Sequence, residues 1–318
     1  MNGMDNSWAQ AMAQQAAIEA FYGPLPAANV DLHVELTQTQ HRPGYTLFCW
    51  QVQAGKPVGP RWALRLAWPR GAQSAPVLLS PDACWPHVVG AEALRQCLRL
   101  RVALAWVDRT QWASDDARSL HLGPVHRQWP EQPWSAIAVW AWGLGQSSQA
   151  LGQKMGGQIA RLGVVGHSRG GKAALLAASL YSQIDAVVAH NSGTGGASSL
   201  QNPPAQAETL AQLGAAFPHW LSAQALRPSV QQSLIEADAP YAWLRAIAPR
   251  GLCVLQALDD LWAHPEGSRR MVERLRPHWQ ATPWRLHLRQ RSGGHAMGAD
   301  DWREAAQYMR RLADEGQG

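Results

Sequence analysis

The sequence has 318 residues, of which 46% are hydrophobic and 16% are charged, so it can bury a substantial core. Its net charge of +5 comes from scattered arginines and three lysines, without the basic block typical of nucleic-acid-binding proteins. No apolar run reaches the roughly 18 residues that span a bilayer. We therefore expect neither a nucleic-acid partner nor a membrane-inserted segment.

The N-terminal forty residues combine a Gln-rich helical pattern over Ala11–Ala20 with the Pro-containing segment YGPLP. No basic stretch followed by an apolar one is visible there, as an export signal would require. The sequence therefore predicts a cytoplasmic protein. We interpret residues 1–40 as a helical and extended extension of a single domain that spans residues 1–318.

Short segments with strand-like sequence follow, and a polar segment comes after them. Alternating or β-branched and aromatic residues predict strands at 46–53, 61–68, 76–80 and 98–107. A polar, Pro-containing loop is expected over 108–133.

From Trp134 onward, helical and strand-like segments alternate. Ala-rich apolar sequence predicts a buried helix over 134–151 and another helix over 172–181. Apolar strands are predicted at 162–166, 185–193, 252–258 and 284–290, the last two each followed by helical sequence. This alternation indicates an α/β fold with a mostly parallel central sheet and helices on both faces. The segment Gly193–Pro204 reads as a long active-site loop.

The strongest local motif is Gly166-His167-Ser168-Arg169-Gly170, which lies between an apolar strand and a helix. In that context G-x-S-x-G predicts an α/β-hydrolase nucleophile turn, with the serine hydroxyl held above the sheet. The hydroxyl of Ser168 then lies near a helix N-terminus. The backbone N–H of Arg169 is expected to donate to a developing oxyanion.

A serine nucleophile requires a histidine base and an acid that orients it, in the chain order Ser, Asp or Glu, His. His295 follows a predicted strand in the Gly-rich segment RSGGHAMG and is the expected base. Asp260, after the preceding strand, is the expected acid, and Asp259 is the alternative. Glu266 belongs to the first turn of the next predicted helix.

No metal or organic cofactor is expected. The four cysteines lack the spacing of a disulfide framework or a metal site. The expected reaction is two-step acyl transfer, in which Ser168 attacks an ester carbonyl and water then deacylates it, and this requires only side chains and water. The loop near residues 80–85 is a candidate source of the second oxyanion donor.

Together these residues resemble carbohydrate esterase family 15, the glucuronoyl esterases and their bacterial relatives. The resemblance covers roughly residues 132–311 and follows an ordered set of segments: WAWGL at Trp140, GHSRGGKAAL at Gly166, NSGTGG at Asn191, FPHW at Phe217, AIAPR at Ala246, DDLWAHPEG at Asp259 and GGH at Gly293.

The resemblance implies that the enzyme cleaves the ester between glucuronic acid on xylan and a lignin alcohol. It implies that the side chain of Arg169 stabilises the oxyanion. Lys172 is then expected to hydrogen-bond sugar hydroxyls, Glu208 to contact the sugar, and Trp262 to line the sugar pocket.

The sequence also departs from the family. Fungal members carry the catalytic Glu just before the SGxGG segment, where this chain has Asn191. Many bacterial relatives use an acid after the later strand, which favours Asp260. The stretch before AIAPR lacks the His found in many members, and family enzymes that attack biomass are usually secreted.

Two other functions remain open from the sequence. One is a general intracellular carboxylesterase that acts on a small-molecule ester. The other is a non-catalytic binding protein on a hydrolase scaffold, against which a complete Ser-His-Asp set argues. No sequence feature assigns an oligomeric state.

Overall fold

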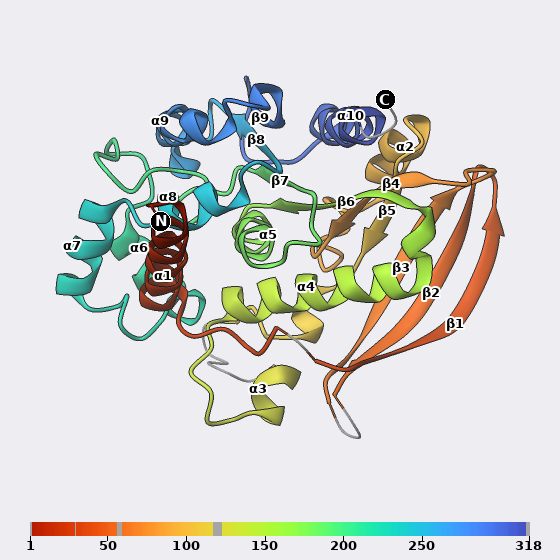
Figure 1. Cartoon of the computed structure of the whole chain (residues 1–318), viewed down its shortest axis with the longest axis horizontal. Coiled ribbons are helices and arrows are strands. Elements are labelled where there is room, and N and C mark those ends of the chain that lie inside the picture. Colours follow the sequence, from red (N-terminus) through yellow and green to blue (C-terminus); the bar gives the residue numbers. More distant parts are fainter. Residues whose placement is uncertain (1, 29, 56–58, 117–122, 316–318) are drawn as a thin grey trace.

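A nine-stranded sheet forms the centre of the computed structural model, which describes residues 2–28, 30–55, 59–116 and 123–315 (Figure 1). In spatial order the strands are β1 (Leu32–Arg42), β2 (Tyr45–Ala54), β3 (Arg61–Pro69), β5 (Ala103–Trp106), β4 (Ala75–Ser80), β6 (Ile159–His167), β7 (Ala186–His190), β8 (Gly251–Ala257) and β9 (Leu286–Arg291). The pairs from β1 to β5 are antiparallel. All pairs from β5 to β9 are parallel.

The helices of the described chain connect and cover these strands. They are α1 (Asn2–Tyr22), α2 (Ala91–Arg99), α3 (Pro124–Gln128), α4 (Ala136–Met155), α5 (Arg169–Leu180), α6 (Leu210–Ala216), α7 (Pro228–Ala237), α8 (Pro240–Leu244), α9 (Pro265–Leu275) and α10 (Ala299–Glu315). Ser135 caps α4 by accepting a hydrogen bond from the N–H of Ala138, which explains why this helix begins there. None of the described helices is both long and apolar enough to cross a membrane.

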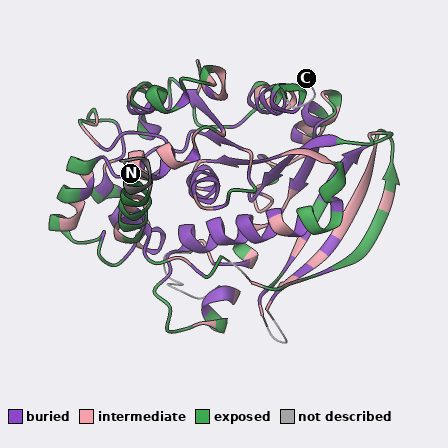
Figure 2. Cartoon of the chain, in the orientation of Figure 1, coloured by how far each residue is buried: buried purple, intermediate pink, exposed green. Residues whose placement is uncertain are grey.

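Two apolar layers pack on opposite faces of the sheet. Leu78, Val165 and Val188 share a cluster with residues of α2 and α10. Their chain neighbours Val164 and Val187 belong to the other cluster, which includes α4 and α5. Successive residues of a strand point to opposite faces, so each central strand is buried on both sides. Figure 2 shows this as a buried centre flanked by the exposed outer strand β1. The predicted α/β architecture is confirmed.

The strand β1 was missed by the sequence reading, which placed no strand before residue 46. Its first residues, LHVEL, alternate apolar and polar side chains over only five positions, and the remaining TQTQHR is uniformly polar because most of this edge strand is exposed. Its pairing with β2 runs from Leu32↔Ala54 to Arg42↔Tyr45. Backbone hydrogen bonds to a neighbouring strand therefore define β1.

The predicted strand at 98–107 was wrong at its start. Residues up to Arg99 belong to α2, Arg101 adopts a positive φ of 54°, and β5 begins only at Ala103. The apolar run crosses a helix end and a turn, and periodicity cannot separate them. The predicted loop 108–133 also contains the short helix α3, whereas residues 117–122 lie outside the described ranges.

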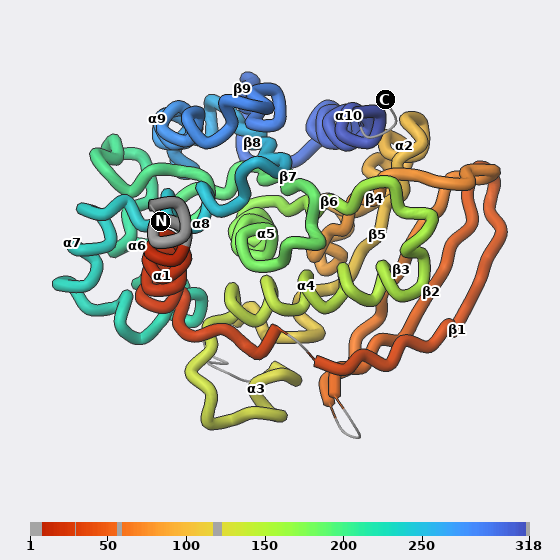
Figure 3. Tube along the Cα trace, in the orientation of Figure 1, coloured from red at the N-terminus to blue at the C-terminus, as the bar shows by residue number. Residues whose placement is uncertain are grey.

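The N-terminal helix packs on the side of the molecule where α7 and α8 lie (Figure 3). Phe21 and Tyr22 at its end are fully buried and contact Trp243 of α8. The hydroxyl of Tyr22 donates to the carbonyl of Gly195 at 2.6 Å. The N-terminal segment thereby supports the loop that follows β7, at the edge of the sheet where the parallel strands end.

Candidate active site

Ser168 lies in a strained turn between β6 and α5. Its φ and ψ of 54° and −120° are unusual for a residue with a side chain, and its N–H donates to the carbonyl of His190 at 2.8 Å. A Cβ at Gly166 would overlap the backbone of Gly170, and one at Gly170 would overlap the carboxylate of Asp82. The small residues of the motif are therefore required by close packing, and the turn holds the Ser168 side chain at the helix N-terminus.

His295 and Asp260 form a hydrogen-bonded pair next to this turn. The Nδ1 of His295 lies 2.6 Å from the Oδ2 of Asp260, whose side chain is 7% exposed. A carboxylate accepts at Nδ1, so the proton is on that nitrogen and Nε2 keeps its lone pair. The pair has the arrangement of an acid that orients a base.

Asp259 contacts the backbone of the loop that carries His295. Its Oδ2 accepts a hydrogen bond from the N–H of Gly293 at 2.6 Å, so it fixes the backbone of the Gly-rich loop. The imidazole of His295 contacts Asp260 instead. The geometry therefore favours Asp260 over Asp259 as the orienting acid.

Asn191 occupies the place at which fungal members of the resembled family carry their acid. Its Oδ1 accepts from the N–H of Ala257 at 2.8 Å, and its Nδ2 donates to the carbonyl of His295 at 3.1 Å. The amide thus connects the end of β8 to the loop that carries His295. It supports the position of the loop through backbone groups.

Arg169 is the first residue of α5, so its backbone N–H has no acceptor within the helix. Its guanidinium donates to Asp115 at 2.9 Å and lies over the ring of Trp220, 4.4 Å from the centroid. Both the backbone and the side chain of Arg169 can therefore donate toward a carbonyl that reacts at Ser168.

Asp115 was not identified from the sequence, although it organises this side of the site. Besides Arg169, it accepts from Arg109 at 3.2 Å and from the indole of Trp220 at 3.1 Å. Burial alone would raise the pKa of Asp115, but His219 and the two arginines outweigh it and lower the pKa to about 2. Asp115 lies in a polar loop without a motif, so only its spatial partners reveal it.

Three backbone N–H groups of the loop near residues 80–85 already have acceptors within the protein. The N–H of Asp82 donates to the Ser80 hydroxyl, that of Ala83 to the carbonyl of Val107, and that of Trp85 to the carbonyl of Asp82. None of these described residues lines the pocket at Ser168. The guanidinium of Arg169 is therefore the better placed donor.

Lys172 is buried beneath the loop that follows β7. Its Nζ donates to the carbonyls of Ser192 at 2.6 Å and Thr194 at 2.7 Å, which leaves one of its three N–H groups. Burial lowers the pKa of Lys172 to about 8, although the nearby Glu208 acts in the opposite direction. Lys172 therefore shapes the loop and has one donor left for a ligand.

Glu208 and Trp262 complete a polar pocket. Glu208 is 6% exposed, and its burial raises its pKa against the effect of Lys172. Trp262 is 49% exposed, and its carbonyl accepts from the N–H of Glu208. The pocket has a volume of about 170 Å³ and is lined by Ser168, Arg169, Lys172, Asn191, Ser192, Gly193, Glu208, Phe217, Trp220, Trp262, Ala263 and His295.

The structure thus brings most of the expected site residues to one pocket. Ser168 and His295 both line it, and Asp260 lies behind His295. No hydrogen bond joins Ser168 and His295 among the described residues, and such bonds often tighten only when substrate binds. Within the described ranges, no group of three or more His, Cys, Asp or Glu side chains could hold a metal ion.

The chain matches known proteins in sequence and in fold. The family model described as glucuronyl esterase of fungi matches residues 69–282. A carbohydrate esterase, MZ0003, from an unknown prokaryotic organism is 28% identical over 134 residues, which cover 42% of this chain and 30% of that relative. The aligned part is thus less than a third of the curated relative.

Several solved structures share the fold. A glucuronoyl esterase from Solibacter usitatus has a TM-score of 0.82 at 24% identity and covers 96% of this chain and 93% of that chain. One from Caldicellulosiruptor kristjansonii has a TM-score of 0.81 at 19% identity, covering 99% and 87%. The catalytic domain from Hypocrea jecorina has a TM-score of 0.70 at 17% identity, covering 98% and 85%. The predicted α/β-hydrolase fold is confirmed.

Proposed function

The chain belongs to the glucuronyl esterase family, and on that premise we propose that it is a serine ester hydrolase that cleaves esters of glucuronic acid. The observation that carries the proposal is the arrangement of Ser168 and the His295–Asp260 pair around one polar pocket. The names of the similar structures supply the substrate class, since they are glucuronoyl esterases.

In the first step, the Oγ of Ser168 attacks the ester carbonyl carbon while Nε2 of His295 takes its proton. Asp260 holds Nδ1–H and stabilises the imidazolium that forms. The carbonyl oxygen becomes an oxyanion, which accepts hydrogen bonds from the N–H and the guanidinium of Arg169. Asp115 and Trp220 keep that guanidinium in place.

In the second half, the imidazolium of His295 gives its proton to the leaving alcohol, and the C–O bond breaks. This leaves the acyl group on Ser168. A water molecule then attacks the acyl carbon, and His295 takes a proton from it. Collapse of the second tetrahedral intermediate returns the proton to Ser168 and releases the free acid. Acylation and deacylation use the same base and the same oxyanion donors, so both can take place in this one pocket.

Recognition of the acyl sugar is assigned to the buried polar side of the pocket. A glucuronate ester has no charge at the reacting carbonyl but carries ring hydroxyls. The remaining N–H of Lys172 can donate to one hydroxyl, and the carboxyl group of Glu208 can accept from another. The exposed ring of Trp262 offers a face for the sugar ring.

The proposal is tested by comparing benzyl glucuronate with p-nitrophenyl acetate, using the wild-type protein and Lys172→Met. We expect hydrolysis of both esters, and a loss of activity in the variant that is larger for benzyl glucuronate. Hydrolysis of the acetate alone would refute the sugar-ester assignment and leave a general carboxylesterase. Hydrolysis of neither ester, with Ser168 unreactive toward a fluorophosphonate, would contradict enzymatic function and leave a binding protein.

A further inference from the structure

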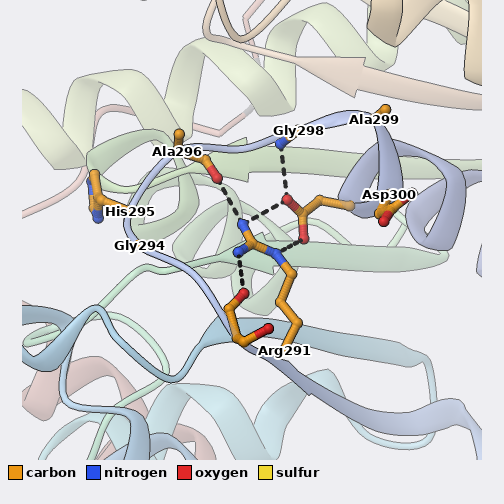
Figure 4. Close-up of a pocket in the computed structure, with 9 residues that line it drawn as sticks. Arg291, Gly294, His295, Ala296, Gly298, Ala299 and Asp300 are labelled. Carbon is orange, nitrogen blue, oxygen red and sulfur yellow. Dashed lines mark hydrogen bonds and ion pairs between the residues drawn. The ribbon is translucent and has the colours of Figure 1, made fainter.

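One guanidinium, that of Arg291, holds the loop that carries His295 (Figure 4). Arg291 is the last residue of β9. Its Nη1 donates to the carbonyl of Ser292 at 3.0 Å, and its Nη2 donates to the carbonyl of Ala296 at 2.7 Å. These two carbonyls flank the segment Gly293-Gly294-His295, so one side chain fixes both of its ends.

Asp301, in the first turn of α10, holds this guanidinium. Its Oδ1 accepts from Nε of Arg291 at 2.7 Å, and its Oδ2 accepts from Nη2 at 2.8 Å. The same carboxylate accepts from the N–H of Gly298 at 2.9 Å. Asp301 is 4% exposed, and a two-point Arg–carboxylate contact fixes direction as well as distance. Figure 4 shows the Arg291 side chain below the loop, with dashed lines from its guanidinium to neighbouring oxygens that include the carbonyl of Ala296.

Two buried histidines connect this pair to the back of His295. Nε2 of His190 lies 3.4 Å from Asp301 and 3.3 Å from Arg291, and its Nδ1 lies 2.8 Å from Nδ1 of His167. The ring of His167 packs against that of His295, with the centroids 4.6 Å apart. The backbone of the loop and the ring of His295 are therefore connected to the same group of buried side chains.

We propose that Arg291 and Asp301 are positioning residues for the reaction at Ser168, because their ion pair fixes the loop of residues 292–296 and with it the imidazole of His295. This inference rests on the proposed function, since it concerns the same site. Neither residue touches the reacting atoms.

The loop needs such support because it has little packing of its own. It contains two adjacent glycines, and the side chain of His295 is 48% exposed. Contacts from the rest of the fold must then set the loop position. Asn191 holds one carbonyl, Asp259 holds one N–H, and Arg291 holds the two carbonyls at the ends. Removing Arg291 takes away the only contact among these that spans the loop.

The test compares Arg291→Met with Arg289→Met. Arg289 lies on the same strand and makes an ion pair with Glu304 of the same helix, so it is a matched control for the loss of a β9–α10 ion pair. We expect Arg291→Met to lower kcat by about 10- to 100-fold, since a misplacement of about 1 Å can cost that much. KM should change by less than about threefold, because the sugar contacts lie elsewhere. Arg289→Met should stay within about twofold of the wild type.

Equal activity of the two variants would overturn the proposal, and so would a loss that appears only in KM. If Arg291→Met does not fold, Arg291→Lys and Asp301→Asn replace it. Lysine keeps the charge but cannot span both carbonyls, so kcat should still fall while the thermal midpoint stays near that of Arg289→Met. A wild-type kcat in Arg291→Lys would refute the need for a guanidinium that contacts both carbonyls.

A second readout separates this inference from the substrate proposal. The rate at which a fluorophosphonate labels Ser168 depends on His295 and requires no sugar. Arg291→Met should label more slowly than Arg289→Met, even if no glucuronate ester is hydrolysed. Added guanidinium ion, well below unfolding concentrations, should partly restore labelling in Arg291→Ala and not in Arg289→Ala. Equal labelling rates in the two Met variants would refute the positioning role independently of the substrate.

Discussion

Replacing Asp115 by Asn tests the charge arrangement beside the nucleophile. The carboxylate accepts hydrogen bonds from Arg109, Arg169 and Trp220, and its side chain is 15% exposed. Its pKa of about 2 lies below the ordinary value of 3.8. At about 1.4 kcal/mol per pH unit, that gap corresponds to about 2 kcal/mol of stability from the ionised form.

The stability contributed by ionised Asp115 depends on pH. Because the folded pKa is lowered, the contribution is fully present above the unfolded value near 4 and is lost as the pH falls toward about 2. Asp115→Asn should therefore lower the free energy of unfolding by about 2 kcal/mol at pH 7. The difference from the wild type should shrink below about pH 4. Glu131→Gln, an exposed carboxylate in the same segment, should have little effect at either pH.

The assay combines urea unfolding at several pH values with steady-state kinetics. Arg169 loses a charged acceptor in Asp115→Asn, so its guanidinium is held less firmly. We expect kcat to fall by about 10- to 100-fold, which is less than or similar to the loss of a whole oxyanion donor. Wild-type kcat in a destabilised variant would refute the role of Asp115 in placing Arg169. An unchanged unfolding free energy would refute the argument from its pKa.

Three further predictions concern the same site. Asp260→Asn should lower kcat by about 10⁴-fold because the imidazole loses its orienting acceptor, whereas Asp259→Asn should cost far less; comparable losses in the two variants would contradict the assignment. Above about pH 8, Lys172 loses the proton that serves the sugar, so KM should rise for benzyl glucuronate and not for p-nitrophenyl acetate; a parallel rise would argue against sugar contact by Lys172. Gly170→Ala should lack a cooperative thermal unfolding transition, because the added Cβ would overlap the carboxylate of Asp82. An unfolding transition like that of the wild type would show that the turn can relax around the extra atom.

The nucleophile turn was predictable because its conformation requires particular residues at fixed positions. Gly166 and Gly170 are required by close contacts within and behind the turn, and the strand and helix around them have clear patterns. The base and the acid followed from chain order, and the structure places His295 and Asp260 in contact. Their catalytic roles stay predictions until they are tested.

Other features depend on partners that are remote in sequence. Asp115 meets Arg169 across 54 positions, and Arg291 meets His190 across 101. Nothing near either residue in the chain signals these contacts. The strand β1 was missed for a related reason, since its partners are backbone groups of β2 and its own side chains are mostly exposed. The single-domain organisation and the cytoplasmic location stay predictions.

Ser168 is proposed to attack the carbonyl carbon of a glucuronate ester. The most direct measurement is the release of benzyl alcohol from benzyl glucuronate by the wild-type protein and by Ser168→Ala, purified in parallel and matched for thermal stability. We expect turnover by the wild type and a loss of at least about 10⁴-fold in the variant. No release by the wild type, or comparable release by Ser168→Ala, would contradict it.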